Sequence, residues 1–134
     1  MAYKLIMTFP GVSLEQAWEC ISNWTKRKGY DARLSSTDIL EEDSNSALLY
    51  GVSDKMPLPG ISQRDWVIES LKLKNGSGEG RHNLVTLNRT DARKPIGAGF
   101  FDYVRLYVHI HGFNIEAEGS GVKITEIRSF DMNG

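Results

Sequence analysis

Residues 103–130 carry the longest strand pattern in the chain and read YVRLYVHIHGFNIEAEGSGVKITEIRSF. In the first half of this stretch, aliphatic side chains alternate with polar or aromatic ones, which is the two-residue period of a β-strand. One predicted face carries Val104, Leu106, Val108 and Ile110. The other carries Tyr103, Arg105, Tyr107, His109 and His111. Turn residues 118–121 divide the stretch, so it predicts an antiparallel hairpin with one apolar face.

Two further hairpins and a single strand are predicted before this stretch. Residues 32–40 and 47–52 flank a polar turn, whose acidic side chains we interpret as solvated. Residues 64–74 and 82–88 flank a glycine-rich turn, and residues 3–9 alternate up to a Pro-Gly break. Short turns join antiparallel strands, because parallel strands need long crossover connections. The pattern therefore predicts one antiparallel sheet.

One short helix is predicted between the first strand and the hairpins. Ser13 and Gln16 have the spacing of a capping box, in which each side chain accepts a hydrogen bond from the other residue's backbone N–H. An apolar stripe at helical spacing follows, formed by Leu14, Ala17, Trp18 and Ile21. We expect the helix to end between residues 23 and 28, before Gly29. One helix followed by a meander of strands is typical of the α+β class.

A helix of this length cannot cover a sheet of six or seven strands. The apolar face predicted for the sheet therefore needs a second covering element, or it forms the wall of a cavity.

The composition is that of an ordinary soluble domain. The chain has 134 residues, 40% of them hydrophobic and 25% charged, with a formal net charge of −1. This length predicts one domain, residues 1–134, and the near-neutral charge gives no electrostatic reason to expect nucleic acid as a partner. No apolar run approaches the ~20 residues of a membrane-spanning helix. With the single cysteine, Cys20, these features predict a cytoplasmic protein without a disulfide framework.

No motif in the sequence indicates a catalytic or cofactor site. His109 and His111 could present two imidazoles to a metal ion, but a third ligand such as His82 or Glu116 would have to come from elsewhere in the fold. We therefore interpret both as solvent-facing. Cys20 lies beside the apolar stripe of the helix and is interpreted as a small buried side chain. We predict no enzyme activity, no metal and no cofactor.

Five motifs in chain order resemble the START family, the lipid-transfer domains related to the steroidogenic acute regulatory protein. They are residues 12–18, residues 56–67, Pro95 with residues 103–105, residues 112–115 and residues 125–134. The segment 56–67 reads MPLPGISQRDWV and is similar to the family's proline pair followed by Arg-Asp-aromatic-Val at the start of a central strand. The order of all five motifs over nearly the whole chain, rather than any one of them, indicates the family.

The resemblance implies a helix-grip fold, in which a strongly curved antiparallel sheet wraps a long C-terminal helix and one lipid lies between them. It also implies transfer or sensing of a sterol, phospholipid or fatty acyl lipid without covalent chemistry. The family's N-terminal segment and C-terminal lid helix have no counterpart in these 134 residues, so we expect an incomplete domain. Several family members have a buried arginine–acid pair in the cavity. The strand that follows residues 64–66 has no second arginine for such a pair, so the resemblance does not imply headgroup recognition.

Strand parity and the resemblance together indicate the candidate site residues. We expect the lipid to contact Trp66, Ile68, Val104, Leu106 and Val108. We assign a structural role to Arg64, Asp65 and Arg105. Adjacent residues on a strand point to opposite faces, so Arg64 and Asp65 cannot both line one cavity. Charge-assisted hydrogen bonds from one of them are expected to hold the preceding proline-rich loop.

Two other functions stay open. The same cavity could belong to a cyclase or hydrolase of the wider Bet v 1-like superfamily, or the open groove could bind a partner helix. Transient membrane contact is compatible with lipid transfer. We also expect self-association through the uncovered apolar face, because monomers rarely expose large contiguous apolar patches.

Overall fold

The computed structural model describes residues 2–31, 36–53, 59–60, 62–96 and 103–131. Three expected features fall partly outside these ranges, at residues 32–35 of a strand and residues 56–58, 61 and 132–134 of two motifs. The elements are β1 (Ala2–Pro10), α1 (Leu14–Ser22), α2 (Trp24–Tyr30), β2 (Thr37–Glu42), β3 (Ser46–Val52), β4 (Arg64–Leu73), β5 (Arg81–Asn88), β6 (Val104–Arg105), β7 (Tyr107–Glu118) and β8 (Gly121–Asp131).

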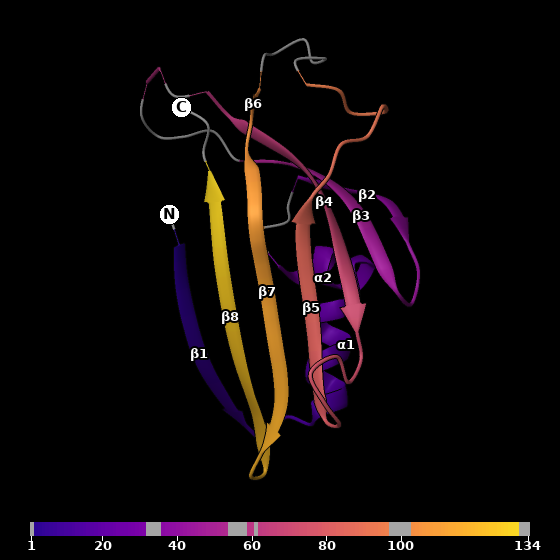
Figure 1. The fold of residues 1–134 in the computed structure, drawn as a ribbon, viewed down its shortest axis with the longest axis vertical. Helices are drawn as coiled ribbons and strands as arrows, with labels where there is room; N and C mark the ends of the chain where they lie inside the picture. Colours follow the sequence, from indigo (N-terminus) through magenta and orange to yellow (C-terminus); the bar gives the residue numbers. More distant parts are fainter. Residues whose placement is uncertain (1, 32–35, 54–58, 61, 97–102, 132–134) are drawn as a thin grey trace.

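The strands form one curved sheet in the order β1-β8-β7-β5-β4-β3-β2, and these neighbours are antiparallel (Figure 1). The three predicted hairpins are confirmed as β2–β3, β4–β5 and β7–β8. Both helices lie on one face of the sheet, behind β4 and β5 in Figure 1. The predicted α+β class and curved antiparallel sheet are therefore confirmed. The part of the chain that is described contains two short helices where one was expected.

The predicted strand that starts at Tyr103 is divided, because residues 104–106 pair with β4 rather than with the final hairpin. The short strand β6 runs parallel to β4, which corrects the expectation of antiparallel pairing throughout. The N–H of Leu106 donates to the backbone oxygen of Asp65 at 2.8 Å, and β7 begins at the next residue.

The capping box at the start of α1 is confirmed. Ser13 Oγ accepts from the Gln16 N–H (3.1 Å), and Gln16 Oε1 accepts from the Ser13 N–H (2.9 Å). The single helix expected to end between residues 23 and 28 is instead two helices. Asn23 separates them with an extended backbone (φ −88°, ψ 98°), while its side-chain oxygen accepts from the Lys26 N–H at 3.0 Å. A second N-cap therefore restarts the helix.

Glu42 anchors α2 to the sheet, although the acidic turn around it was expected to be solvated. Its carboxylate accepts hydrogen bonds from the backbone N–H groups of Trp24 (2.8 Å) and Thr25 (3.0 Å), and from Lys72 Nζ (3.1 Å). Burial opposes ionisation of the carboxyl, but a hydrogen bond from the Thr25 hydroxyl (2.6 Å) and the three above prevail and hold the pKa of Glu42 below its ordinary value. The ionised carboxylate keeps the start of α2 beside β2.

The hydrophobic core lies between the two helices and the concave face of the sheet. Leu49, Leu84 and Ile115, from β3, β5 and β7, have no exposed surface. Trp18 of α1 and Trp24 of α2 pack in the same cluster. The core therefore joins both helices to the middle of the sheet.

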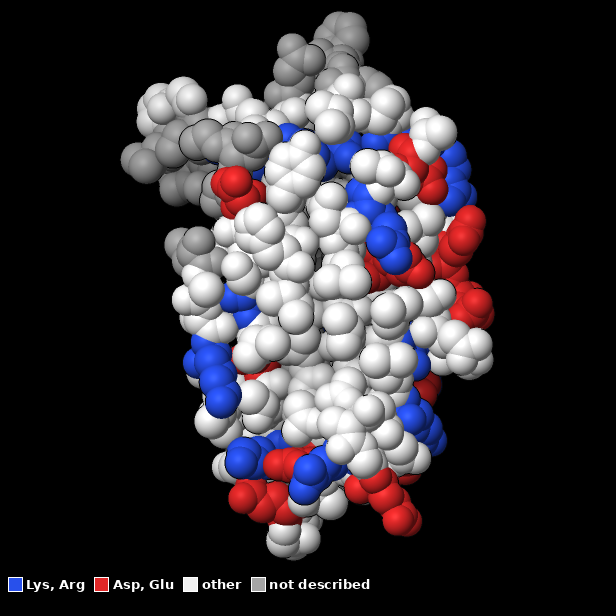
Figure 2. All heavy atoms as spheres, in the orientation of Figure 1, with Lys and Arg blue, Asp and Glu red and all other residues white. Residues whose placement is uncertain are grey.

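The opposite face of the sheet is turned toward the viewer in Figure 2. Charged side chains gather at its lower end and along one side, and the middle is largely uncharged. Within the described ranges, no helix is long and apolar enough to cross a membrane.

Candidate ligand-binding cavity

A cavity of about 210 Å³ opens on the concave side of the sheet, beside α2. Its wall consists of Trp24, Arg27, Trp66, Ile68, Thr86, Leu106, Val108, His111, Arg128 and Phe130. These side chains come from α2, β4, β5, β7, β8 and the residue between β6 and β7. The cavity therefore depends on segments from most of the chain, and its wall combines apolar and basic groups.

Four of the five expected lipid-contacting residues line this cavity, namely Trp66, Ile68, Leu106 and Val108. Val104 is not among the lining residues, and it pairs with Arg64 at the end of β4. Trp66 lies against Gly51 of β3, where an added β-carbon would come within 2.3 Å of the indole ring. The absence of a side chain at Gly51 therefore makes room for one cavity wall. Contact of these residues with a lipid stays a prediction.

The alternation of β7 shifts by one residue at His109. Val108 and Ile110 pair with consecutive residues of β8, so His109 is an extra residue in a β-bulge. His109 is exposed, and beyond it the two faces exchange, which turns His111 into the cavity wall. The interpretation of His111 as solvent-facing is therefore wrong, because periodicity alone does not predict a bulge. The described residues contain no group of three His, Cys, Asp or Glu that could hold a metal ion.

A buried polar cluster forms around His111. Glu126 Oε1 lies 2.8 Å from His111 Nε2 and 3.0 Å from Arg128 Nη2. Burial lowers the pKa of His111; the hydrogen bond with Glu126 opposes this shift, and the charge of Arg128 adds to it. The imidazole is therefore uncharged at pH 7. It donates its Nε2–H to the carboxylate, which has only acceptors.

Arg27 brings a second guanidinium to the wall. Its side chain is almost fully buried, and its Cζ lies 4.3 Å from the ring centroid of Trp24 and 5.4 Å from that of Phe113. Its Nε lies 3.2 Å from Asp31 Oδ2, and Nη1 donates to the backbone oxygen of Ile21 at 3.2 Å. Trp24 and Arg27 are three residues apart on α2, so one helix face supplies both to the cavity.

The residues expected from the sequence at the cavity did not include Arg27, Glu126 or Arg128. For the two β8 residues a signal existed, because the two-residue period places them on the same face as the buried Ile124. No sequence signal indicated Arg27, because its position in the wall depends on the start of a second helix after Asn23.

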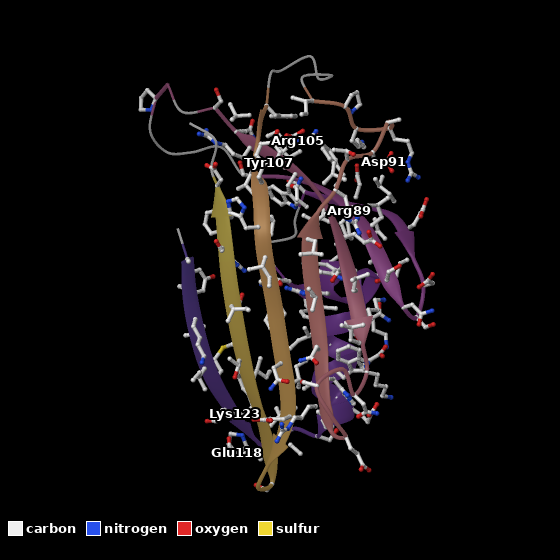
Figure 3. The ribbon with its side chains drawn as sticks, in the orientation of Figure 1. Arg89, Asp91, Arg105, Tyr107, Glu118 and Lys123 are labelled. Atoms are coloured by element: carbon white, nitrogen blue, oxygen red, sulfur yellow. The ribbon has the colours of Figure 1, made fainter. Side chains whose placement is uncertain are left out.

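Arg64, Asp65 and Arg105 are buried, and none of them lines the cavity. Arg105 donates two hydrogen bonds to the Asp65 carboxylate (Nε–Oδ1 2.8 Å, Nη2–Oδ2 3.1 Å) and one to the backbone oxygen of Lys94 (3.0 Å). The Arg64 guanidinium donates to the backbone oxygen of Ser62. Figure 3 shows Arg105 at the upper end of the sheet, near Tyr107. These contacts join β4, β6 and the segment after β5; their structural role stays our interpretation.

A curved antiparallel sheet with helices and an apolar cavity on its concave face defines an α+β fold of the helix-grip type. Human STARD10 has this fold, with a TM-score of 0.78 and 21% identity over 99% of this chain. The human StarD13 lipid transfer and protein localization domain has a TM-score of 0.76 and 20% identity, also over 99% of this chain. The Zhui aromatase/cyclase from Streptomyces sp. R1128 is more distant, with a TM-score of 0.53 and 12% identity over 100% of this chain and 72% of its own.

These comparisons confirm the START-like fold that the five motifs predict. The chain spans 52% of the STARD10 chain and 64% of the StarD13 chain, so it is similar to about half to two thirds of each. No family model matches the chain, and a search of curated proteins finds no match. The likeness is therefore one of fold.

Proposed function

We propose that the chain binds a hydrophobic small molecule of the lipid type in this cavity and carries it without covalent chemistry. The observation that carries the proposal is the cavity itself, about 210 Å³ in volume and walled largely by apolar side chains on the concave face. The fold supports the same function, because it is shared with the StarD13 lipid transfer and protein localization domain.

The size of the cavity bears on what it can hold. Pockets for drug-sized ligands typically measure about 300–1,000 Å³, so a cavity of about 210 Å³ suits a smaller molecule or one end of a longer lipid. Apolar ligand surface buried against Trp66, Leu106 and Phe130 contributes ~25 cal/mol per Å² removed from water. The remainder of a long lipid would lie along the exposed apolar side chains of β1, such as Tyr3 and Leu5.

The proposal takes residues 1–134 as one lipid-binding unit that contacts membranes transiently to exchange a sterol, a phospholipid or a fatty acyl lipid. Its proposed location is the cytoplasm. Cys20 is a free thiol and, against expectation, exposed on α1. An exposed thiol is compatible with a reducing compartment.

Native mass spectrometry of the purified protein tests this function. We expect a lipid-sized adduct that is released on denaturation, or one that forms after incubation with a lipid extract. The same measurement on Val108→Glu, which places a carboxylate in the cavity wall, should show no adduct. A chain that stays unoccupied after incubation, or one that retains only a protein partner, would contradict the proposal.

One observation favours a second candidate, an enzyme acting on a hydrophobic substrate. The His111–Glu126 pair lies at the cavity wall and could exchange a proton with a bound molecule. The Zhui aromatase/cyclase shares the overall fold. Mass analysis of the recovered ligand separates the two candidates: an unchanged ligand supports carriage, and a product whose formation requires His111 supports the enzyme.

A further inference from the structure

Two hydrogen-bond donors on side chains that line the cavity have no acceptor among the described residues. Trp24 Nε1 and Arg128 Nε are both buried, and neither finds a hydrogen-bond partner among the described residues. Both side chains line the cavity. Most buried polar groups in folded proteins are paired, so two unpaired donors in one cavity wall need an explanation.

The surrounding groups do not supply the missing acceptors. The Glu126 carboxylate lies next to Arg128, but it accepts from Arg128 Nη2 and His111 Nε2 rather than from Arg128 Nε. The Trp24 indole faces the Arg27 guanidinium, whose Cζ lies 4.3 Å from the ring, and a guanidinium has no acceptor.

The charges at this end of the cavity balance. Arg27 is paired with Asp31 at 3.2 Å, and Arg128 with Glu126 at 3.0 Å. His111 is uncharged at neutral pH, because burial lowers its pKa. This end of the cavity therefore lacks a hydrogen-bond acceptor, whereas its positive charges are already neutralised.

We infer that the ligand is a lipid whose polar end is an uncharged acceptor oxygen without a donor, as in a ketone or an ester, held by Trp24 Nε1–H and Arg128 Nε–H. This inference rests on the proposed function and names the ligand class of the same cavity. Neither nitrogen is open to water in the structure, so ligand entry has to reorient the two side chains slightly, as is common on binding. A carbonyl oxygen has two lone pairs, so one that reaches both nitrogens can accept a hydrogen bond from each.

Three ligands with the same chain length test the inference: n-octane, 2-octanone and octanoate. Their affinities follow from displacement of a fluorescent apolar probe by the wild-type chain. We expect 2-octanone to bind about tenfold more tightly than n-octane, the size of one net hydrogen bond or more. Octanoate should bind more weakly than 2-octanone, because the positive charges of Arg27 and Arg128 are already paired. Tighter binding of octanoate would overturn the inference that the oxygen is uncharged. Equal affinities for n-octane and both oxygen ligands would overturn the inference and leave the proposed function standing.

The indole N–H signals provide a second measurement that needs no change to the cavity. The chain has three tryptophans, Trp18, Trp24 and Trp66. In a nitrogen-15 NMR spectrum, we expect the Trp24 indole proton to move downfield with 2-octanone and not with n-octane. A Trp24 signal that responds equally to the two ligands would contradict a hydrogen bond at Nε1.

Matched variants separate the donors from the apolar wall. Trp24→Phe and Arg128→Lys each remove one unpaired N–H, and each should reduce the preference for 2-octanone over n-octane by about tenfold. Trp66→Phe trims the same cavity and should weaken both ligands alike. If Trp24→Phe does not fold, Arg128→Lys and the wild-type spectrum still decide. If no ligand of the series binds the wild-type chain, the proposed function fails and the inference fails with it.

Discussion

His109 changes the chemistry of the cavity although it is itself exposed. Without this extra residue, the period that places Val108 inward would continue through Gly112 and Asn114. With it, His111 and Phe113 take the inward positions instead. A one-residue bulge therefore replaces a glycine and an amide by an imidazole and a phenyl ring.

Val108 and His109 are adjacent in the chain, but they should respond differently to mutation. Val108→Glu places a charge in the apolar wall and should reduce lipid binding by more than about tenfold, because a buried unpaired charge is strongly unfavourable. His109→Ala alters only an exposed side chain and should leave binding unchanged. Displacement of a fluorescent fatty acyl probe measures both. Loss of binding in His109→Ala would show that our assignment of the two faces is wrong.

His111 should make the stability of the chain depend on pH. Its pKa is lowered by burial and by the charge of Arg128, whereas in the unfolded chain it returns to about 6.5. Below about pH 6.5 the unfolded chain takes up a proton that the folded chain resists, so the free energy of unfolding falls as pH is lowered. At pH about 5.5 this loss is at most about 1.4 kcal/mol.

Urea unfolding at pH about 7.5 and about 5.5 measures the effect of this residue. His111→Gln should lose less stability than the wild type between the two values, and His109→Gln should behave as the wild type. An identical pH dependence in His111→Gln and the wild type would mean that the imidazole titrates normally in the fold.

At the scale of the elements, glycine has opposite roles in β3 and α2. Gly51 in β3 has no room for a side chain, since an added β-carbon would lie 2.3 Å from the Trp66 ring. Gly29 in α2 has open space around the same position. The strand therefore needs its glycine for packing, whereas the helix does not.

Alanine substitutions at these two glycines should have opposite signs. Gly51→Ala should destabilise the chain by about 1–3 kcal/mol, because overpacking forces Trp66 out of place. Gly29→Ala should stabilise it by about 0.5–1 kcal/mol, because alanine favours the helix. Chemical unfolding measures both, and probe binding should weaken only in Gly51→Ala. A neutral Gly51→Ala would mean that Trp66 moves freely in the cavity.

At the scale of the whole molecule, β1 is the least covered part of the sheet. It is an edge strand, and the two helices lie behind β4 and β5, away from most of β1 (Figure 1). Tyr3, Leu5 and Phe9 are 41%, 45% and 42% exposed, on the same side as the cavity. An apolar edge strand of this kind offers both side chains and backbone groups for pairing.

We expect the chain to self-associate through this edge with a dissociation constant on the order of 10–100 μM, as for a weak apolar contact. Sedimentation equilibrium across a concentration series measures it, with Leu5→Lys as a variant that should shift the equilibrium toward monomer. The exposed Thr8→Lys on the other side of β1 is the matched control. A 15.0 kDa monomer at every concentration, without a bound amphiphile, would show that this face needs no partner.

The features that depend on neighbouring residues in the chain could be predicted from the sequence. The Ser13–Gln16 capping box and the three hairpins follow from short-range spacing and turn chemistry, and they define the α+β class. Strand parity together with the family resemblance predicted Trp66, Ile68, Leu106 and Val108 for the cavity wall, although Val104, chosen in the same way, does not line it. Each of these features rests on a local period or on contacts a few residues apart.

The polar part of the cavity depends on contacts between residues far apart in the chain. The Glu42 carboxylate holds the start of α2 from 17 residues away, and only then do Trp24 and Arg27 reach the wall. The bulge at His109 arises in the pairing of β7 with β8, and the pairing of Leu106 with Asp65 ends the predicted strand. Such contacts leave no repeating pattern in the sequence, because they stabilise the chain only after residues far apart in sequence have come together. Much of the apolar wall could therefore be predicted from strand parity and the family resemblance, whereas the placement of the donors depended on the tertiary structure.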